Sequence, residues 1–377
     1  MPEMRIRAAV LERSGLSRPF AESRPLSIRE LELDPPGPGE LLIRLEAAGV
    51  CHSDLSVVNG SRLRPMPMVL GHEGAGVVEA IGPSVDDVAV GERVVMVFLP
   101  RCGECAACRT DGKMACIPGS AANGNGTLMS GARRLRRNGD SVQHHLGVSA
   151  FATHAVVDRR SVVPVGSDIP AEVAALLGCA VLTGGGAVIN AGRLAAGQDI
   201  IIVGLGGVGM ASLLTAVALG HGDVIGVDAL DEKLQRARQL GATAAYAPAE
   251  AVEGGIRAPL VIEAAGHPRA FETAVALTAP GGTTVTVGLP DPADRSSISP
   301  LVLTAEARTI LGSYLGSAVP SRDIPFFADL WRAGRLPVEQ LISSSIDLDH
   351  INEAMDGLAD GTQVRQLIRF PQGRSGD

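Results

Sequence analysis

The sequence lacks an excess of positive charge. Of its 377 residues, 33 are Lys or Arg and 41 are Asp or Glu, so the formal net charge is −8 at pH 7. Proteins that bind nucleic acids in general present a basic surface, and this balance argues against such a partner. The one basic run, residues 133–137, is interpreted as a solvated loop rather than a polyanion site.

The sequence also lacks an apolar export signal and an uninterrupted hydrophobic run. Residues 1–5 lead directly into a strand-like alternating stretch. Two apolar windows, residues 173–190 and 200–220, are interrupted by glycine clusters, and buried parallel strands have the same apolar appearance. We therefore expect no membrane span and a cytoplasmic protein. A hydrophobic content of 46% excludes a disordered chain.

The pattern of predicted secondary structure changes along the chain. From Arg5 to about Val165, short β-like runs alternate with Gly and Pro, which predicts a β-rich, barrel-like unit. From about Gln198, strands alternate with helices, which predicts a parallel, doubly wound sheet. The expected strands there are residues 199–203, 223–228, 260–263 and 283–287. The tail from Ile324 reads as helices followed by a last strand near its end.

A glycine-rich stretch follows the first strand of the second region and opens a helix. Gly204, Gly206 and Gly209 match the pattern G-x-G-x-x-G, with Gly207 and Val208 between the last two. Glycines at these positions allow a tight turn and a close approach of backbone to a pyrophosphate, which the helix N-terminus attracts. The stretch predicts a dinucleotide site.

An acidic residue in the right place selects the dinucleotide. Asp228 ends the second strand, 19 residues after Gly209. A carboxylate there accepts hydrogen bonds from a ribose 2′-hydroxyl and repels the 2′-phosphate of NADP, so NAD is the expected cofactor. Lys233 is a candidate for a second contact, with a solvated helix charge as the alternative.

Four of the six cysteines lie within 15 residues of one another. Cys102, Cys105, Cys108 and Cys116 have the spacing C-x2-C-x2-C-x7-C. Four thiolates in a short loop close a tetrahedral zinc site with no open position, which indicates a structural role. An iron–sulfur cluster and free buried cysteines are the alternatives.

The two remaining cysteines, Cys51 and Cys179, flank His72 in the sequence. A Cys-His-Cys set leaves the fourth position of a zinc ion open for water or substrate, as catalytic zinc sites do. A buried core residue is the usual interpretation of one isolated histidine or cysteine. Here the set accounts for the cysteines outside the four-cysteine loop, which favours a second metal site.

These motifs together resemble the zinc-dependent medium-chain alcohol dehydrogenases, in particular their dimeric branch with the liver-type and formaldehyde dehydrogenase-like enzymes. The matching stretches are residues 49–54, 71–76, 102–116, 177–179, 204–209 and 364–365. The resemblance implies an α/β protein with a GroES-like β-rich catalytic domain and a Rossmann domain. The implied bounds are residues 1–180, completed by 315–377, for the catalytic domain and 181–314 for the NAD-binding domain.

The resemblance also implies roles for individual residues around a catalytic zinc. Cys51, His72 and Cys179 would hold that zinc, making two zinc ions per chain with the four-cysteine loop. The remaining catalytic roles fall to four residues: Asp54 would orient His72, Glu73 would lie behind the zinc, Ser53 would bind the substrate oxygen and start a proton relay, and His52 would face the cofactor.

Cofactor and substrate contacts are implied in the same way. Arg365, with His52, would face the pyrophosphate, and Val208 would press on the nicotinamide. Four residues are candidates for the substrate pocket: Arg62, Phe98, Leu146 and Tyr314.

The expected reaction is the transfer of a hydride between a primary or secondary alcohol and NAD through a zinc-bound alkoxide. Oxidation of a thiol adduct of formaldehyde is the rival substrate within the family. A zinc-free quinone reductase and a non-catalytic relative are the rival classes, and the retained ligands argue against both. By resemblance we expect a homodimer, with a homotetramer as the alternative.

Several features depart from the family pattern or stay without a role. Ser56 occupies the position of a histidine that ends the proton relay in many relatives, so His52 or water is expected to carry the proton outward. Residues 14–23 look like an insertion of unknown function. Residues 247–258, in the third strand–helix segment, look short. His144 and His145 match a family pair and are interpreted as structural.

Overall fold

The computed structural model describes residues 3–193 and 195–371, so the predicted domain ends at 1–2 and 372–377 lie outside the described residues. The chain forms two compact units. The first comprises Met1–Thr110, Ala115–Cys179 and Ile342–Asp377, and the second Asp111–Met114 and Ala180–Leu341. This division and the predicted domains agree closely near Cys179 but differ over residues 315–341, whose assignment to the catalytic domain stays a prediction.

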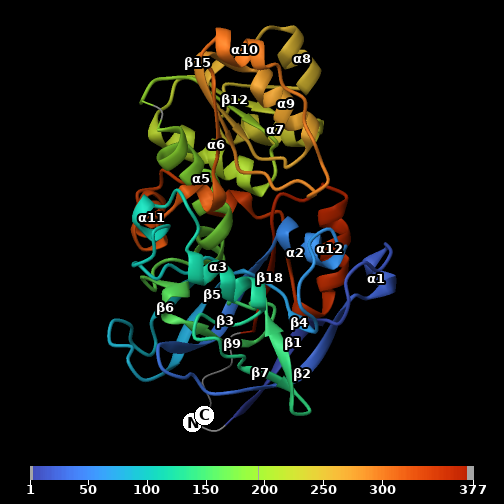
Figure 1. Cartoon of the computed structure of the whole chain (residues 1–377), viewed down its shortest axis with the longest axis vertical. Coiled ribbons are helices and arrows are strands. Elements are labelled where there is room, and N and C mark those ends of the chain that lie inside the picture. Colours follow the sequence, from blue (N-terminus) through green and yellow to red (C-terminus); the bar gives the residue numbers. More distant parts are fainter. Residues whose placement is uncertain (1–2, 194, 372–377) are drawn as a thin grey trace. The chain divides into compact units, whose positions relative to one another are not determined.

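The first unit contains a closed barrel with the strand order β1-β2-β7-β8-β4 (Figure 1). Its strands are β1 (Met4–Leu11), β2 (Leu26–Leu33), β4 (Met68–Val69), β7 (Leu135–Arg137) and β8 (Asp140–His144). Alternate residues of a strand face the same side. Ile6, Ala8 and Val10 of β1 accordingly join one buried apolar cluster with Leu31 and Leu33 of β2. This confirms the expected β-rich, barrel-like unit.

A seven-stranded sheet completes the first unit, in the order β10-β6-β5-β3-β18-β17 with β9 also paired to β3. Its strands are β3 (Glu40–Val50), β5 (Glu73–Ile81), β6 (Arg93–Val97), β9 (His154–Asp158), β10 (Val162–Val165), β17 (Ser344–Ile346) and β18 (Gln366–Arg369). Strands β3 and β5 run antiparallel, with Ala48 opposite Gly74. The residue that follows β3 therefore lies close to the residue that precedes β5.

Short helices connect these strands. They are α1 (Phe20–Ser23), α2 (His52–Val58), η1 (Cys108–Thr110), α3 (Ile117–Asn125), η2 (Arg159–Ser161), α4 (Ala171–Leu176), η7 (Leu348–His350) and α12 (Ile351–Ala359). The segment of residues 14–23 contacts two of these helices, α2 and α12. The N–H of Gly15 donates to the carbonyl of Val58 at the end of α2, at 2.8 Å. The Nε of Arg18 donates to the carboxylate of Asp356 in α12, at 3.1 Å.

The second unit is built on a six-stranded parallel sheet in the order β13-β12-β11-β14-β15-β16. Its strands are β11 (Ile200–Val203), β12 (Val224–Val227), β13 (Ala244–Tyr246), β14 (Ala258–Glu263), β15 (Thr278–Thr286) and β16 (Thr309–Gly312). The order reverses at β11, as in doubly wound folds, where ligands bind outside the carboxyl ends of the strands. The predicted parallel sheet is confirmed.

The helices of the second unit begin with α5 and end before β17. They are α5 (Leu182–Gly186), η4 (Ala187–Gly192), α6 (Gly207–Leu219), α7 (Asp231–Gln239), α8 (Pro248–Glu253), α9 (Pro268–Ala276), α10 (Pro300–Ala305), η5 (Tyr314–Ser317), α11 (Pro320–Arg332) and η6 (Val338–Leu341). The third strand–helix segment is short, as expected: β13 has three residues and α8 has six.

One apolar helical run passes from α4 to η4. Among the described residues, Ala171–Gly192 is the helix whose length and composition would allow it to span a membrane. The protein buries 89% of its apolar window, and the core helix of a globular protein passes the same test. We therefore interpret it as a core helix.

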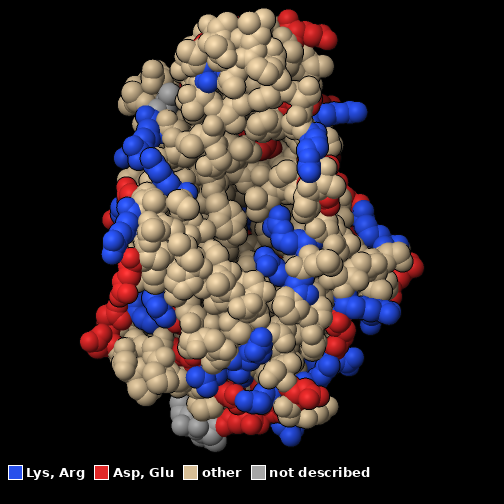
Figure 2. Space-filling view, in the orientation of Figure 1, with Lys and Arg blue, Asp and Glu red and all other residues tan. Residues whose placement is uncertain are grey.

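The basic run at residues 133–137 was expected to be a solvated loop, and this is wrong for its last three residues, which form β7. Leu135 is buried in strand β7, and arginines on both sides of it pair with carboxylates. Arg134 pairs with Glu40 at 2.7 Å and Arg136 with Asp34 at 3.1 Å. Figure 2 shows acidic and basic side chains interspersed on the lower part of the visible face. One buried leucine among half-buried arginines is too short a pattern to predict a strand, so the charge density of the run favoured a loop.

Candidate active site

Cys51 lies at the junction between a strand and a short helix. It directly follows β3 and caps the N-terminus of α2 in extended backbone geometry. Its N–H donates to Oδ2 of Asp54, at 3.2 Å, which satisfies one of the free donors at the start of the helix. The same turn of α2 carries exposed His52 and half-buried Ser53 beside the buried thiol.

His72 and Glu73 lie where β5 begins. Gly71 precedes them with a φ of +89°, and a Cβ there would come within 2.6 Å of the backbone of Phe151, so the turn requires glycine. Nδ1 of His72 lies 3.0 Å from Oδ1 of Asp54. Gly49 on β3 leaves room for Glu73, whose carboxyl carbon would lie 2.5 Å from a Cβ at that position.

Cys179 sits in a π-helical turn, η3 (Leu177–Val181), within the long apolar helix. Such turns are rare in proteins, and those that occur are often found at functional sites. Gly178 packs against β6 so closely that a Cβ would lie 2.4 Å from the carbonyl oxygen of Met96. The sulfur of Cys179 lies 3.5 Å from Nε2 of His72.

The structure thus gathers four donors from three distant parts of the chain: Cys51, His72, Glu73 and Cys179. Their donor atoms all lie within 4.8 Å of one another, and all four residues are buried. A hydrogen bond with Cys179 holds the pKa of the Cys51 thiol well below its usual range, although burial opposes this. Two sulfurs and one imidazole nitrogen at this separation are a donor set that suits zinc.

Glu73 carries a carboxylate without hydrogen bonds in this cluster. Both of its oxygens are fully buried and lack a hydrogen-bond partner among the described residues. Burial raises the pKa of Glu73 to about 7, while the charge of Arg365 opposes that rise. Nη1 of Arg365 lies 3.6 Å from Oε2 of Glu73. A buried carboxylate with a spare oxygen is what a metal site accommodates and an apolar core does not.

Two of the predicted pocket residues border this cluster. The ring of Phe98 meets that of His72 edge to face, with centroids 5.3 Å apart. Leu146 is buried and follows His145, whose ring centroid lies 5.6 Å from that of His72. Their placement fits an apolar wall, and their contact with substrate stays a prediction.

Three other predicted site residues lie in different surroundings. Arg62 is half-buried and follows α2, and its backbone N–H donates to the carbonyl of Ser56 in that helix, at 2.8 Å. Tyr314 belongs to the second unit and is 40% exposed. Arg365 is buried against Glu73, a contact that the sequence analysis did not foresee. Their roles toward substrate and cofactor stay predictions.

His145 is a second residue whose contact the sequence analysis did not anticipate. Its Nδ1 lies 3.2 Å from Oδ1 of Asp54, the carboxylate that also holds His72. His144, its neighbour, has its Nε2 3.0 Å from the N–H of Arg134 in the barrel. Burial lowers the pKa of both histidines, that of His144 to about 3. No spacing rule relates residue 54 to residue 145, because the contact depends on the tertiary fold.

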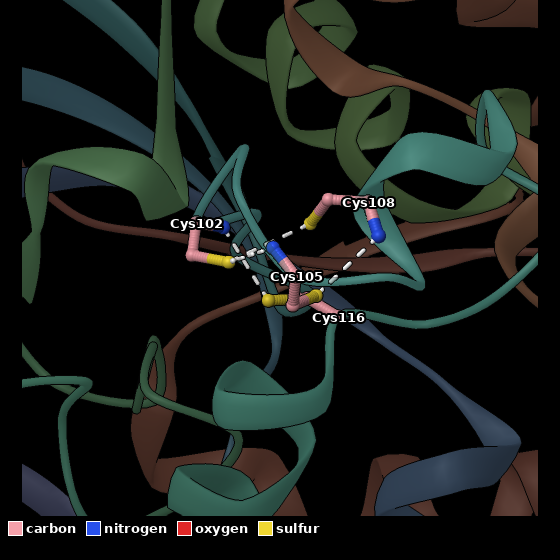
Figure 3. A group of neighbouring side chains, drawn as sticks. All are labelled: Cys102, Cys105, Cys108 and Cys116. Atoms are coloured by element: carbon pink, nitrogen blue, oxygen red, sulfur yellow. Dashed lines mark hydrogen bonds between the residues drawn. The ribbon is translucent and has the colours of Figure 1, made fainter.

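The four-cysteine loop forms a second, local donor set (Figure 3). The sulfurs of Cys102, Cys105, Cys108 and Cys116 point toward one another and lie within 4.8 Å. Backbone N–H groups point at these sulfurs, from Cys105 to Cys102 at 3.4 Å and from Cys102 to Cys116 at 3.3 Å. Hydrogen bonds from the N–H groups of Ile117 and Cys108 lower the pKa of the Cys105 thiol to about 6. Donors aimed at sulfur favour thiolates, the form that binds metal.

The glycine-rich turn of the second unit has the geometry of an anion cradle. Gly204 has a φ of +91°, and a Cβ at Gly209 would come within 1.8 Å of the carbonyl oxygen of Gly204. A Cβ at Gly206, by contrast, would meet nothing within 4 Å. Gly206 caps the 13-residue helix α6, whose first residues, Gly207 and Val208, are half-buried. Open space in front of a helix N-terminus suits a phosphate.

Asp228 lies beside this turn at the carboxyl end of β12. Its Oδ2 accepts the N–H of Leu205 at 2.7 Å, and its Oδ1 accepts that of Leu230 at 3.0 Å. The carboxylate is therefore fixed in direction while it stays half-exposed. Lys233 is half-buried on the first turns of α7. Both cofactor roles stay predictions, and the fixed carboxylate fits a ribose partner.

Known proteins share this architecture. Two family models match: the alcohol dehydrogenase GroES-like domain over residues 37–167 and the zinc-binding dehydrogenase over residues 207–331. The chain is 36% identical over 359 residues to alcohol dehydrogenase D of Mycobacterium tuberculosis. The aligned region covers 93% of this chain and 97% of that protein. It is 34% identical over 375 residues to the NDMA-dependent alcohol dehydrogenase of Amycolatopsis methanolica, with coverage of 97% and 99%.

A solved structure agrees with these matches. Benzyl alcohol dehydrogenase from Acinetobacter calcoaceticus superposes with a TM-score of 0.88 at 30% identity, covering 98% of this chain and 100% of that one. The fold and its sites thus define an oxidoreductase with a GroES-like and a Rossmann-like domain, as expected. The chain belongs to the zinc-dependent medium-chain alcohol dehydrogenase family. Its placement in the liver-type branch stays a prediction.

Proposed function

We propose that this enzyme transfers a hydride between a primary or secondary alcohol and NAD at the cluster of Cys51, His72 and Cys179. The observation that carries the proposal is the convergence of these buried donors next to the turn that bears Ser53. The same donor set would hold a zinc ion, and the loop from Cys102 to Cys116 would hold a second one. When bound, zinc supplies a Lewis acid and the nicotinamide supplies a hydride acceptor.

The residues of the chain have distinct tasks in this reaction. Asp54 accepts a hydrogen bond from Nδ1 of His72, which directs Nε2 toward the metal position. The hydroxyl of Ser53, two residues after Cys51, receives the proton of the alcohol. Ser56 is engaged with the carbonyl of His52 at 2.8 Å, so we expect the proton to leave through His52 or water. Phe98 and Leu146 exclude water from one side of the cluster.

The use of NAD is supported by the turn from Gly204 to Gly209 and by Asp228. The space in front of Gly206 fits a pyrophosphate, and the fixed carboxylate of Asp228 fits the two-hydroxyl ribose of NAD. The relative described as NDMA-dependent supports a second candidate, in which the electrons pass to an acceptor other than free NAD. A thiol adduct of formaldehyde stays the alternative substrate.

A homodimer is part of the proposal, with a homotetramer as the alternative. Strand β16 is the last in the sheet order, and along the described residues its outer side pairs with no strand. Leu311 on this strand is 38% exposed and Leu301 on α10 is 75% exposed. An exposed strand edge with apolar neighbours is suited to pairing with another chain. Light scattering on wild type and Leu311→Lys would test this edge. A cytoplasmic location stays a prediction.

The test combines a metal count with an activity panel. NADH formation would be recorded with aliphatic and benzylic alcohols and with a hydroxymethyl-thiol adduct, and each substrate would be repeated with NDMA as acceptor. Turnover of an alcohol with NAD, with about two zinc ions per chain, is the expected result. Turnover with NDMA alone would favour the second candidate, and a metal-loaded chain with no turnover in any arm would contradict the proposal.

A further inference from the structure

Asp54 is the hub of hydrogen bonds behind the buried cluster. It is completely buried, and its Oδ1 accepts the N–H of Gly71 at 3.2 Å as well as the bond from His72. Burial alone would raise its pKa, but the charge of His72 and the bonds from His145 and His72 lower it to about 2. The orientation of the Asp54 carboxylate therefore depends on the groups that donate hydrogen bonds to it.

His145 is a second imidazole on this carboxylate. Its Nδ1 is buried without a well-aligned hydrogen bond, and Oδ1 of Asp54 lies 3.2 Å away. Buried polar nitrogens in folded proteins are as a rule satisfied, so Asp54 is the natural acceptor for this N–H. The ring of His145 also meets that of His72 edge to face, at an interplanar angle of 89°.

The turn that carries His145 is held in a strained form. Leu146 and Ser149 are non-glycine residues in the left-handed region, with φ of +53° and +54°. Such conformations cost about 1 kcal/mol or more each and persist where the surroundings impose them. The hydroxyl of Ser149 accepts the N–H of His145 and donates to the carbonyl of Val69, both at 3.0 Å. The turn is thus fastened to the chain that leads into His72.

We propose that His145 is a positioning residue, which holds Asp54 and the flank of His72 and thereby sets the direction in which His72 presents Nε2 to the metal. This goes beyond the structural interpretation drawn from the sequence, and it rests on the proposed function because it assumes a metal at this cluster. Phe98 restricts the ring of His72 as well. The ring is therefore fixed by a hydrogen bond to Asp54 and by contacts with two other rings.

His144 provides a matched control within the same pair. It is as buried as His145 but uses Nε2, which accepts the N–H of Arg134, and not Nδ1. An asparagine amide reaches about as far as Nδ1 of histidine, and a glutamine amide about as far as Nε2. The two positions are therefore expected to prefer opposite amide substitutions. At position 145, His145→Asn keeps the contact with Asp54 and His145→Gln loses it. At position 144, His144→Gln keeps the contact with Arg134 and His144→Asn loses it.

The experiment measures metal affinity rather than activity. Metal-free wild type and the four variants would be titrated with zinc against a chromophoric chelator and with Co²⁺ monitored by its visible spectrum. Cys179→Ala identifies the signal of the buried cluster. We expect His145→Gln to weaken zinc binding at this cluster about tenfold, which is the lower end of the range for loss of a residue that supports a metal ligand. The variant should also shift the Co²⁺ absorption bands. His145→Asn should restore most of the affinity.

Of the two control variants, His144→Asn should lower thermal stability more than His144→Gln, and both should leave both metal readouts unaltered. Equal zinc affinity in His145→Gln and wild type, or an equal loss in His145→Asn, would overturn the proposal while the proposed function stands. A wild type that binds the same amount of metal as Cys179→Ala would overturn both. If His145→Gln does not fold, His145→Ala removes the same contact without adding a buried amide.

Discussion

The two cysteine-containing donor sets of the first unit are built in opposite ways. Cys102, Cys105, Cys108 and Cys116 come from one loop, and three of them are partly exposed. Cys51, His72 and Cys179 come from a helix cap, a strand start and a π-helical turn, and all are buried. The local set offers four sulfurs and closes on itself. The dispersed set offers three ligands and an unbonded carboxylate, which leaves it able to exchange a ligand.

The largest expected effect separates catalysis from folding. Cys179→Ala removes one ligand of the dispersed set, and we expect kcat/KM for the best alcohol to fall by about 10³-fold or more, since a metal's charge stabilisation contributes several kcal/mol. The zinc content should fall from two to one per chain with little change in Tm. Steady-state kinetics and metal analysis check this. An active variant would mean that this set does not hold the catalytic metal.

The second effect falls on stability. Cys105→Ala breaks the local set, and we expect Tm to fall by about 10 °C, or roughly 3–5 kcal/mol in a domain of this size. The folded fraction should keep its turnover per folded chain. Calorimetry and kinetics at low temperature measure the two quantities. A loss of activity larger than the loss of folded protein would contradict the division of labour between the sets.

The third prediction concerns how stability depends on pH through Glu73, a buried carboxylate that has no counterpart in the local set. Glu73 has its pKa raised from 4.5 to about 7 in the folded chain, so the folded state holds a proton that the unfolded state loses. The stability of the metal-free protein should therefore be unaffected by this group below pH 4.5 and should fall by at most roughly 3 kcal/mol as pH rises to 7.

Glu73→Gln removes the titration and is the control for this effect. The Tm of metal-free wild type should decline more steeply with rising pH than that of the variant. Parallel curves for the two proteins would show that folding does not raise the pKa of Glu73. The same pair measured with zinc bound reports how far the metal stabilises the charged form.

The smallest expected effect concerns the stability contributed by the contacts of Arg18, which are remote from both donor sets. Arg18→Met removes ion pairs from residue 18 to Asp356 and Asp360, and so loosens the segment that contacts the end of α2. Exposed ion pairs contribute about 1 kcal/mol or less, so Tm should fall by a few degrees at most, and less in high salt. Zinc bound by the four-cysteine loop should not change. A salt-independent loss would point to packing of the arginine stem instead.

Much of this site was readable from the sequence because its signals are local. The spacing of the four cysteines, the turn from Gly204 to Gly209 and the acidic residue at 228 follow from a few consecutive or nearby residues. The alternation of strands and helices after residue 198 likewise predicted the parallel sheet. Residue type and spacing carry such information because a turn or a loop is closed by neighbours in the chain.

The parts that could not be read depend on contacts between distant residues. Nothing in the spacing of Asp54 and His145 announces that they share a contact, and Arg365 carries no sign that it lies against Glu73. The run at 133–137 was expected to be a loop, but its last three residues form β7, and Arg134 and Arg136 pair with carboxylates that are distant in the sequence. Residues 14–23 had no interpretation until their contacts with α2 and α12 were visible.

By itself, the sequence determined which chemical groups this protein has and which of them can bind a metal or a phosphate, because ligand type, glycine positions and periodicity are properties of the chain. Only the tertiary structure decided which of these groups meet. Burial and the register of β3 with β5 bring Cys51 to His72, and a strained turn brings His145 to Asp54. Those contacts depend on the packing of the whole first unit, a sum of many small terms that no single stretch of sequence specifies.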